Sequence, residues 1–309
     1  MVDIKEIKSV KLAPFTLMAS SISAILAFIG AILYLILFSI VGAFLPNFGA
    51  TLAWVGVAFV IILPIAAFFI GIATNFFSVF LYNNLVPRLG GIKLGLEGSD
   101  VTELPVASFA FILAVIEGIW AFIVGLFLAA ALVPFTTFLS SAIPLVSQSI
   151  ANTTNITNTT GAAMPTGSLV GAAGVVGAIF LIIGLPILVF IVGFIFNALA
   201  AIFYNYIATK ASKVKLEFAA VSEKLFELKT IPVVPAALAV AIVMAVIGLI
   251  IGIINLIRFS ALGYPGLGAI NLISSFIGYF IQYFIVTAIA AFFYNFLVPR
   301  IGGIKLKLE

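Results

Sequence analysis

One signature occurs three times in this chain, and it constrains the architecture more than any other feature. The first copy, Tyr82–Leu94, returns with few changes as Tyr294–Leu306, and a more divergent copy, Tyr204–Leu216, lies between them. In the divergent copy, Ser212 and Lys213 replace a pair of glycines. A signature that recurs along a chain indicates internal structural repeats. The sequence therefore predicts one small unit that is used three times.

The composition places these units in a membrane. Apolar residues make up 64% of the chain and charged residues 8%, whereas soluble domains carry about 25% charged residues. A helix crosses a bilayer with ~20 apolar residues. Six runs reach that length: Phe15–Phe44, Leu52–Leu81, Val106–Pro134, Leu169–Tyr206, Val233–Ile257 and Ile270–Phe296.

Two runs fall in each predicted repeat. The repeats cover residues 7–98, 101–218 and 228–309, and the second contains a long external loop at 135–168. A repeat with two spans keeps its orientation, so three of them predict a pseudo-threefold arrangement about the membrane normal. The sequence leaves open whether that axis is hollow or filled by side chains.

Short strands are predicted after the second span of each repeat. Apolar residues alternate with polar ones at Ile92–Leu96, Val214–Phe218 and Ile304–Leu308, and alternation is the strand pattern. Each strand needs a partner, which is another repeat, the N-terminal segment or a second protein. Ser222–Lys229 is predicted to be a short amphipathic linking helix. The expected fold class is thus an all-α polytopic membrane protein, with six transmembrane helices in three tandem repeats and a short cytoplasmic strand after each.

The basic residues predict the orientation. If the N-terminus is cytoplasmic, every lysine and arginine except Arg258 falls on the cytoplasmic side, as the positive-inside rule requires. We therefore expect a multi-pass plasma-membrane protein with both termini in the cytoplasm. The net charge of +4 then needs no nucleic-acid partner. The first span reads as a retained helix rather than a signal peptide.

Three acceptor sequons for N-glycosylation lie in the predicted external loop, at Asn152, Asn155 and Asn158. They are either glycosylation sites or chance matches, because a loop rich in Thr and Asn generates such triplets easily.

The ending of each repeat resembles a known family. Two spans followed by Tyr-Asn, Gly-Gly and alternating apolar residues are similar to a family of small prokaryotic two-helix membrane proteins of unknown function. The resemblance is good in the first and third repeats and degraded in the second. It implies no activity.

The chain contains no cysteine and no histidine. This excludes disulfides, thiol chemistry, metal or haem sites held by imidazole, and Ser-His nucleophiles. We expect no cofactor and no enzymatic activity, since an intramembrane enzyme would need paired acids or a nucleophile with its base.

Glu117 is the single acidic residue inside a predicted span. An intramembrane carboxylate is costly and is by default a candidate functional group. It either handles protons or ions, or it is a neutral acid that bonds to a facing helix. We favour the second reading.

A better-founded candidate set recurs in all repeats. Its members are a small polar residue and, seven positions later on the same helix face, a tyrosine: Asn75 and Tyr82, Asn197 and Tyr204, Thr287 and Tyr294. These residues either line an axial path or form interhelical hydrogen bonds with interfacial tyrosine anchors. We favour the bonds.

Two further sets follow the tyrosines. Asn83, Asn205 and Asn295 are expected to cap the helix end or its turn, and Arg88, Lys210 and Arg300 to contact lipid headgroups.

From these features we predict a non-enzymatic integral membrane scaffold or accessory subunit. Its partners would be the lipid bilayer and either other membrane subunits or further copies of itself. The alternative is a passive pore or small-solute channel along the pseudo-threefold axis.

Overall fold

The computed structural model describes residues 2–45, 48–154 and 167–309. It contains two compact units. The first comprises Met1–Ile112 together with Asn197–Glu309, and the second is Leu113–Phe196. Each unit is considered by itself below.

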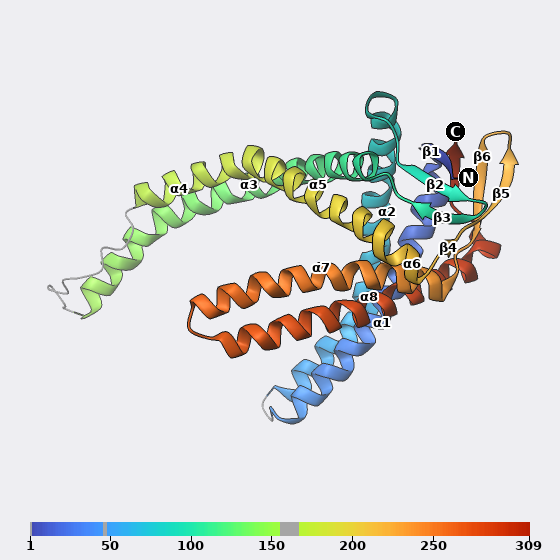
Figure 1. Cartoon of the computed structure of the whole chain (residues 1–309). Coiled ribbons are helices and arrows are strands. Elements are labelled where there is room, and N and C mark those ends of the chain that lie inside the picture. The colour runs from blue at the N-terminus through green and yellow to red at the C-terminus, as the bar shows by residue number, and fades with distance from the viewer. Residues whose placement is uncertain (1, 46–47, 155–166) are drawn as a thin grey trace. The chain divides into compact units, whose positions relative to one another are not determined.

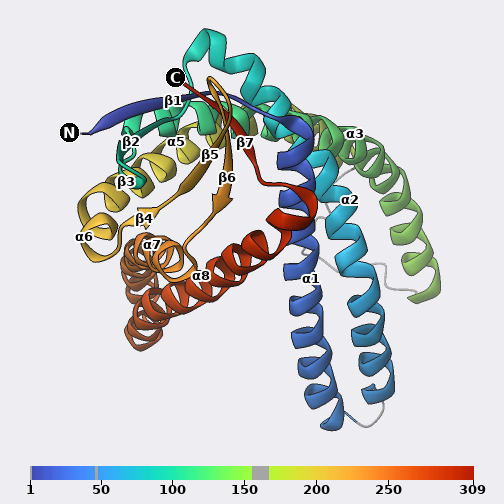
Figure 2. The ribbon, with the colours of Figure 1, turned by 90° about the vertical axis from the view of Figure 1, so that its right-hand side faces the viewer.

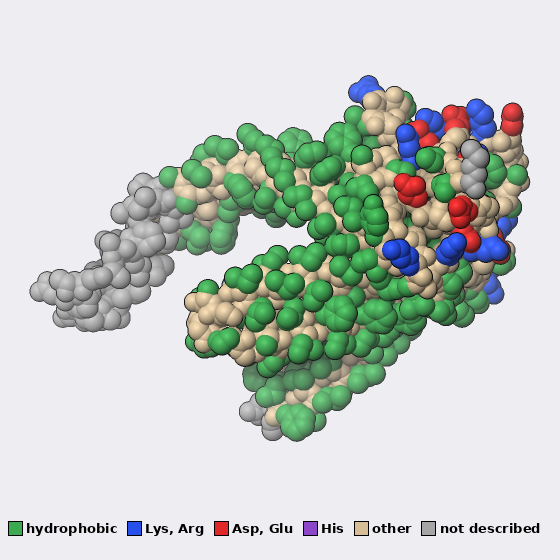
Figure 3. Space-filling model, in the orientation of Figure 1, with side chains coloured by type: hydrophobic (Ala, Val, Ile, Leu, Met, Phe, Trp, Pro, Cys, Tyr) green, Lys and Arg blue, Asp and Glu red, His purple; other side chains and the backbone are tan. Residues whose placement is uncertain are grey.

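Six stretches of helix are long and apolar enough to cross a membrane, as predicted. The helices are α1 (Leu12–Ala43), α2 (Gly49–Leu89), α3 (Val106–Thr154), α4 (Gly167–Ile179), α5 (Leu185–Phe203), α6 (Thr209–Ala211), α7 (Val233–Ala261) and α8 (Pro265–Ile301) (Figure 1). π-Helical turns at Phe180–Gly184 and Tyr204–Ala208 join α4, α5 and α6 into one span. Hydrophobic side chains cover the helices, and charged ones gather over the strands (Figure 3).

The prediction of a loop at 135–168 is wrong over much of that range. In the structure α3 continues to Thr154, and α4 begins at Gly167. The hydroxyls of Thr136 and Thr137 donate to carbonyls one turn back, at 3.0 and 2.7 Å. Polar residues that bond in this way fit within a helix. Asn152 therefore belongs to α3, while Asn155 and Asn158 lie outside the described residues.

Glycines bring the helices of a hairpin into contact. A Cβ atom on Gly71 of α2 would lie 3.2 Å from the Ser20 side chain of α1, and one on Gly252 of α7 would lie 2.8 Å from the Leu272 Cα atom of α8. Small residues allow this close approach between membrane helices. The sequence of α1 with α2, and of α7 with α8, therefore specifies two tightly packed hairpins within the first unit.

A seven-stranded antiparallel sheet corrects the all-α expectation. Its strands are β1 (Asp3–Val10), β2 (Lys93–Glu97), β3 (Asp100–Glu103), β4 (Val214–Lys215), β5 (Glu217–Ser222), β6 (Leu225–Thr230) and β7 (Lys305–Leu308), in the order β4-β3-β2-β1-β7-β6-β5 (Figure 2). The strands predicted after α2, α6 and α8 are present. The strands before α1, α3 and α7 were not predicted.

The helix predicted at Ser222–Lys229 is also wrong. This segment forms the turn and much of β6 in a β5–β6 hairpin, in which Ser222 pairs with Leu225 and Phe218 with Leu228. Phe226 and Leu228 alternate with charged residues, so an extended strand places both on one face. Pairing with β7 on its other side fixes the strand.

The two ends of the strand order are linked through the chain itself. β4 and β5, at the two ends of the strand order, are separated in the chain only by Leu216, whose N–H donates to the Ser99 carbonyl at 2.8 Å. One extended segment thus pairs with β3 and then with β6, just as β1 pairs with β2 and then with β7. We call this arrangement of β1–β7 the β-ring. Within it, β4 pairs only with β3 and β5 only with β6, while the other five strands each have two paired neighbours in the strand order.

The same register recurs three times around the β-ring. A strand before a hairpin pairs with the strand after the same hairpin at Glu6–Lys93, Asp100–Lys215 and Glu227–Lys305. It also pairs with the strand that ends the preceding hairpin, at Ile7–Leu308, Val101–Leu96 and Leu228–Phe218. A hydrophobic core of Met18, Leu228, Tyr294 and Val298 connects the β-ring to α1 and α8.

Candidate functional site

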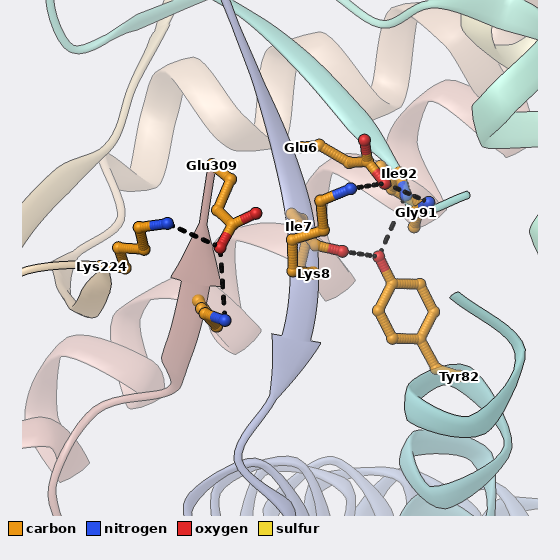
Figure 4. A network of polar contacts seen from close by, with 9 residues as sticks. Glu6, Ile7, Lys8, Tyr82, Gly91, Ile92, Lys224 and Glu309 are labelled. Atoms are coloured by element: carbon orange, nitrogen blue, oxygen red, sulfur yellow. Dashed lines mark hydrogen bonds and ion pairs between the residues drawn. The ribbon is translucent and has the colours of Figure 1, made fainter. Parts of the chain in front are cut away.

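The recurring tyrosines lie where the helices meet the β-ring. Each hydroxyl donates to a backbone carbonyl in the strand that precedes a hairpin. The pairs are Tyr82 with Ile7 at 2.6 Å, Tyr204 with Val101 at 2.8 Å and Tyr294 with Leu228 at 2.6 Å. Figure 4 shows the first of these, with the ring of Tyr82 rising from its helix towards β1. The tyrosines therefore join the end of one helix to the strand that leads into its hairpin mate.

A β-bulge follows each of these carbonyls. In β1 the pairing register shifts by one residue between Ile7 and Ser9. The same shift follows Val101 in β3 and Leu228 in β6. A bulge inserts one residue and interrupts the ladder of hydrogen bonds. The tyrosine hydroxyl supplies a donor at this interruption, which explains why a phenol recurs there.

In two of the copies the hydroxyl also accepts a bond. The N–H of Ile92 donates to Tyr82 at 3.0 Å, and that of Ile304 donates to Tyr294 at 3.1 Å. Each hydroxyl then bridges the strand before its hairpin and the residue that leads into the strand after it. Tyr82 and Tyr294 are buried, so losing the hydroxyl would leave backbone groups unsatisfied.

The asparagines that follow the tyrosines were expected to cap the ends of their own helices or the turns after them. The structure shows that they do not. Each amide instead accepts from the N–H and donates to the carbonyl of one residue just before the partner helix. These residues are Val10 for Asn83 (2.8 and 2.8 Å), Leu104 for Asn205 (2.7 and 2.9 Å) and Ile231 for Asn295 (2.9 and 2.8 Å). A side-chain amide has the donor and the acceptor that a strand would otherwise provide. The amide therefore satisfies the backbone at the point where strand becomes helix.

Two carboxylates complete the site, and sequence reasoning missed them. Glu6 Oε1 accepts from the N–H of Gly91 at 2.8 Å, and Glu227 Oε1 accepts from the N–H of Gly303 at 2.7 Å. Lys8 and Lys229 form ion pairs with the same carboxylates, at 2.9 and 3.0 Å. The repeated Glu-x-Lys spacing before α1 and α7 was the available sequence signal.

Both carboxylates are held in the charged form. Burial acts to raise the pKa of Glu6, but the Gly91 N–H with Lys8 and Lys93 outweighs it and lowers the pKa overall. The Gly303 N–H is the largest influence on Glu227 and, with Lys229 and Lys305, lowers its pKa despite burial. The two acids are therefore ionised anchors at neutral pH.

The smaller polar residues of the predicted set lie deeper along the helices. Asn75 Nδ2 of α2 donates to Ser20 Oγ of α1 at 3.3 Å, which is an interhelical bond. Asn197 is buried. Thr287 lies in an apolar crevice of about 330 Å³, whose other walls include Met18, Ile22 and Tyr294.

Glu117 belongs to the second unit and is half-buried on α3. Its carboxylate lies against Gly193 of α5, where a Cβ atom would overlap Oε2. Glycine at position 193 thus makes room for this acid between two helices.

The basic residues after the tyrosines are all exposed. Arg88, Lys210 and Arg300 lie in the last turns of their helices. The Arg300 guanidinium stacks over the Phe296 ring at 3.6 Å and donates to the Phe296 carbonyl. This side chain is thus folded back along α8.

No group of three or more acidic side chains that could hold a metal ion is found among the described residues. Comparisons of the chain with family models, with curated proteins and with solved structures find no match. The assignment of a function therefore rests on the site itself, whose polar groups bind the chain's own backbone.

Proposed function

We propose that this protein is a non-enzymatic integral membrane scaffold or an accessory subunit of a membrane complex. One observation carries the proposal. The recurring tyrosines, asparagines and glutamates are engaged with backbone groups in the strands of the β-ring or in the residues directly beside them. Side chains committed in this way hold helices in place and are not available to a substrate.

The helices supply the surface that partners would contact. Large apolar side chains project from them, including Trp54, Phe69 and Phe127, which are 74, 65 and 74% exposed. Such faces accept lipid or the helices of other membrane proteins. Partner binding by strand addition is not part of the proposal, since five of the seven strands already have two paired neighbours in the strand order.

The same proposal includes the arrangement in the membrane. It holds that the chain is three tandem two-helix repeats about a pseudo-threefold axis, in the plasma membrane, with the β-ring and both termini in the cytoplasm. The register that recurs three times around the β-ring supports the repeats. The basic residues near the helix ends support the orientation. The resemblance to a family of two-helix membrane proteins rests on the repeated sequence signature alone and stays a prediction.

Extraction from the native membrane in a mild detergent, followed by size analysis and mass spectrometry, tests the proposal. We expect a second membrane protein in fixed stoichiometry. A photoreactive residue at Phe69 should crosslink to that protein, whereas the same residue at the exposed strand position Glu97 should not. Recovery of this chain alone would refute the accessory-subunit proposal.

A pore is the second candidate, and the structure favours it less. Thr287 lies among apolar walls, and Asn75 is bonded to a neighbouring helix, so neither residue provides the hydrated lining that a solute path needs. Flux through liposomes that changes in Glu117→Gln and Asn197→Leu would restore the pore reading.

A further inference from the structure

A small basic pocket lies on the β-ring beside the start of α1. Its volume is about 210 Å³, and its walls are Ser9, Lys11, Ser222, Lys224, Leu225 and Lys307. Ser9 and Lys307 are cross-strand partners, as are Leu225 and Lys307, so these side chains share one face of the sheet. Three lysines and two hydroxyls thus surround one space.

Two of the lysines already converge on a single anionic oxygen. Lys224 Nζ lies 3.1 Å from Glu309 Oε1, and Lys307 Nζ lies 3.3 Å from the same atom. Figure 4 shows Lys224 and Glu309 meeting beside β1. The hydrogen bonds from these lysines lower the pKa of the Glu309 carboxyl, so it is charged at neutral pH. Two of the pocket's lysines can therefore hold one oxyanion between them, and they hold the Glu309 carboxylate, which is not itself a wall of the pocket.

Lys11 adds a third positive charge to the pocket. It immediately precedes α1, and its N–H donates to the Lys305 carbonyl at 2.9 Å, which fixes it beside β7. Glu309 balances one of the three lysines, so the pocket keeps a surplus of positive charge. A basic pocket at the start of a membrane helix is at the level of lipid headgroups.

The cluster of lysines occurs at only one of the three equivalent strand pairings among the described strands. The pairs that correspond to Ser9–Lys307 are Glu103–Gly95 and Thr230–Glu217. Each of these pairs carries a carboxylate and no lysine. The basic pocket is therefore a local addition and does not follow from the repeated framework.

We propose that this pocket binds a phosphate group, which displaces the Glu309 carboxylate from Lys224 and Lys307. The lysine ammonium groups and the serine hydroxyls supply charge-assisted and neutral hydrogen bonds to its oxygens. The phosphate belongs either to the headgroup of an anionic lipid or to a soluble phosphate compound.

Native mass spectrometry of the full chain in a neutral detergent tests this binding. Titration with phosphatidylglycerol should show one tightly bound lipid, and Lys224→Gln with Lys307→Gln should weaken its binding about 25-fold, at about fivefold for each lysine. Inorganic phosphate, titrated separately, identifies the source. Competition at millimolar concentration indicates a soluble phosphate, and no competition indicates a lipid headgroup.

Two further variants make the test specific. Lys213→Gln removes one positive charge close to the end of α6 but outside the pocket, and it should leave binding within twofold, about the error of the titration. Glu309→Gln removes the internal competitor and should strengthen binding several-fold. Equal weakening in the Lys213→Gln and Lys224→Gln/Lys307→Gln proteins, or weaker binding in Glu309→Gln, would overturn the proposal. Lys224→Arg should retain binding, which separates a charge effect from a change in fold.

Discussion

The first and third helix ends differ from the second, although all three carry the tyrosine and asparagine bonds. α2 and α8 are followed directly by Gly90 and Gly302, whose φ angles are 82° and 81°. At the corresponding point the second end has Ser212 with φ of −154°, after the π-helical turn Tyr204–Ala208. The tyrosine and asparagine hydrogen bonds therefore form with either of two backbone conformations at the residue that follows the helix.

The difference separates the roles of side chains and glycines. Gly91 and Gly303 lie so close to the β-ring that a Cβ atom would overlap the carbonyl oxygens of Ile7 and Leu228. L-residues disfavour positive φ, so the second end, which lacks glycine, leaves its helix in an extended conformation. The hydroxyl and amide bonds attach helix to strand, while the glycine pair sets how closely the two approach.

The largest expected effect comes from filling that close approach. Gly303→Ala should destabilise the protein by about 3 kcal/mol or more, because the new methyl group meets a backbone oxygen that cannot move away cheaply. Thermal unfolding in detergent, followed by tryptophan fluorescence, measures it.

Lys213→Ala is the matched control at the second end and should change stability by less than about 0.5 kcal/mol. Gly278→Ala tests glycine loss in open space, since no atom lies within 4 Å of its Cβ position. Equal losses for Gly303→Ala and Lys213→Ala would show that the glycine pair has no special role.

Asparagine variants should affect all three ends. Asn295→Ala leaves the N–H and carbonyl of Ile231 without their partner, which should cost about 2 kcal/mol, and Asn205→Ala should cost about the same. Asn84→Ala is the control, because the Asn84 amide bonds to the Phe80 carbonyl of its own helix at an exposed position. Unfolding temperatures of the three variants compare them directly. A neutral Asn205→Ala would mean that the second end is held in another way.

Tyrosine variants should separate the ends again. Tyr294→Phe removes a hydroxyl that both donates and accepts, at a cost of about 2 kcal/mol. Tyr204→Phe should cost about 1 kcal/mol through loss of the bond to Val101. Chemical unfolding of both, with the exposed Tyr264→Phe as control, measures the difference. A larger loss at Tyr204 would contradict the bridging role of Tyr294.

The smallest effect is the acid dependence of the first and third ends. The pKa values of Glu6 and Glu227 are lowered in the folded protein, so their contribution is complete above the unfolded pKa, near 4.3. It is lost as the pH falls through the lower folded values. We expect the unfolding temperature to drop between about pH 5 and pH 3.

The Glu6→Gln/Glu227→Gln protein should be less stable at pH 7, by about 1 kcal/mol for each residue, and less sensitive to acid over the same range. Unfolding curves at stepped pH values give both quantities. An unchanged acid dependence would exclude these carboxylates as the titrating groups.

Much of the helical part could be predicted from the sequence, because long apolar runs leave a chain few alternatives in a bilayer. The strand after α8 was predictable from the alternation of Ile304, Leu306 and Leu308. β3 was not, since Asp100–Glu103 is short and polar and becomes a strand only between β2 and β4. The Ser222–Lys229 segment was misread for a similar reason, because a short charged segment has no period strong enough to distinguish helix from strand.

The sequence by itself determined six stretches long and apolar enough to span a membrane, the thrice-repeated signature, and the tyrosine and asparagine positions within it. These features depend on composition and on spacing along the chain, which local physics fixes. Only the tertiary structure decided which groups the tyrosine and asparagine side chains form hydrogen bonds with. Their partners are backbone groups tens of residues away, such as the Ile7 carbonyl for Tyr82. Those groups become available only where a β-bulge interrupts the ladder of the assembled β-ring.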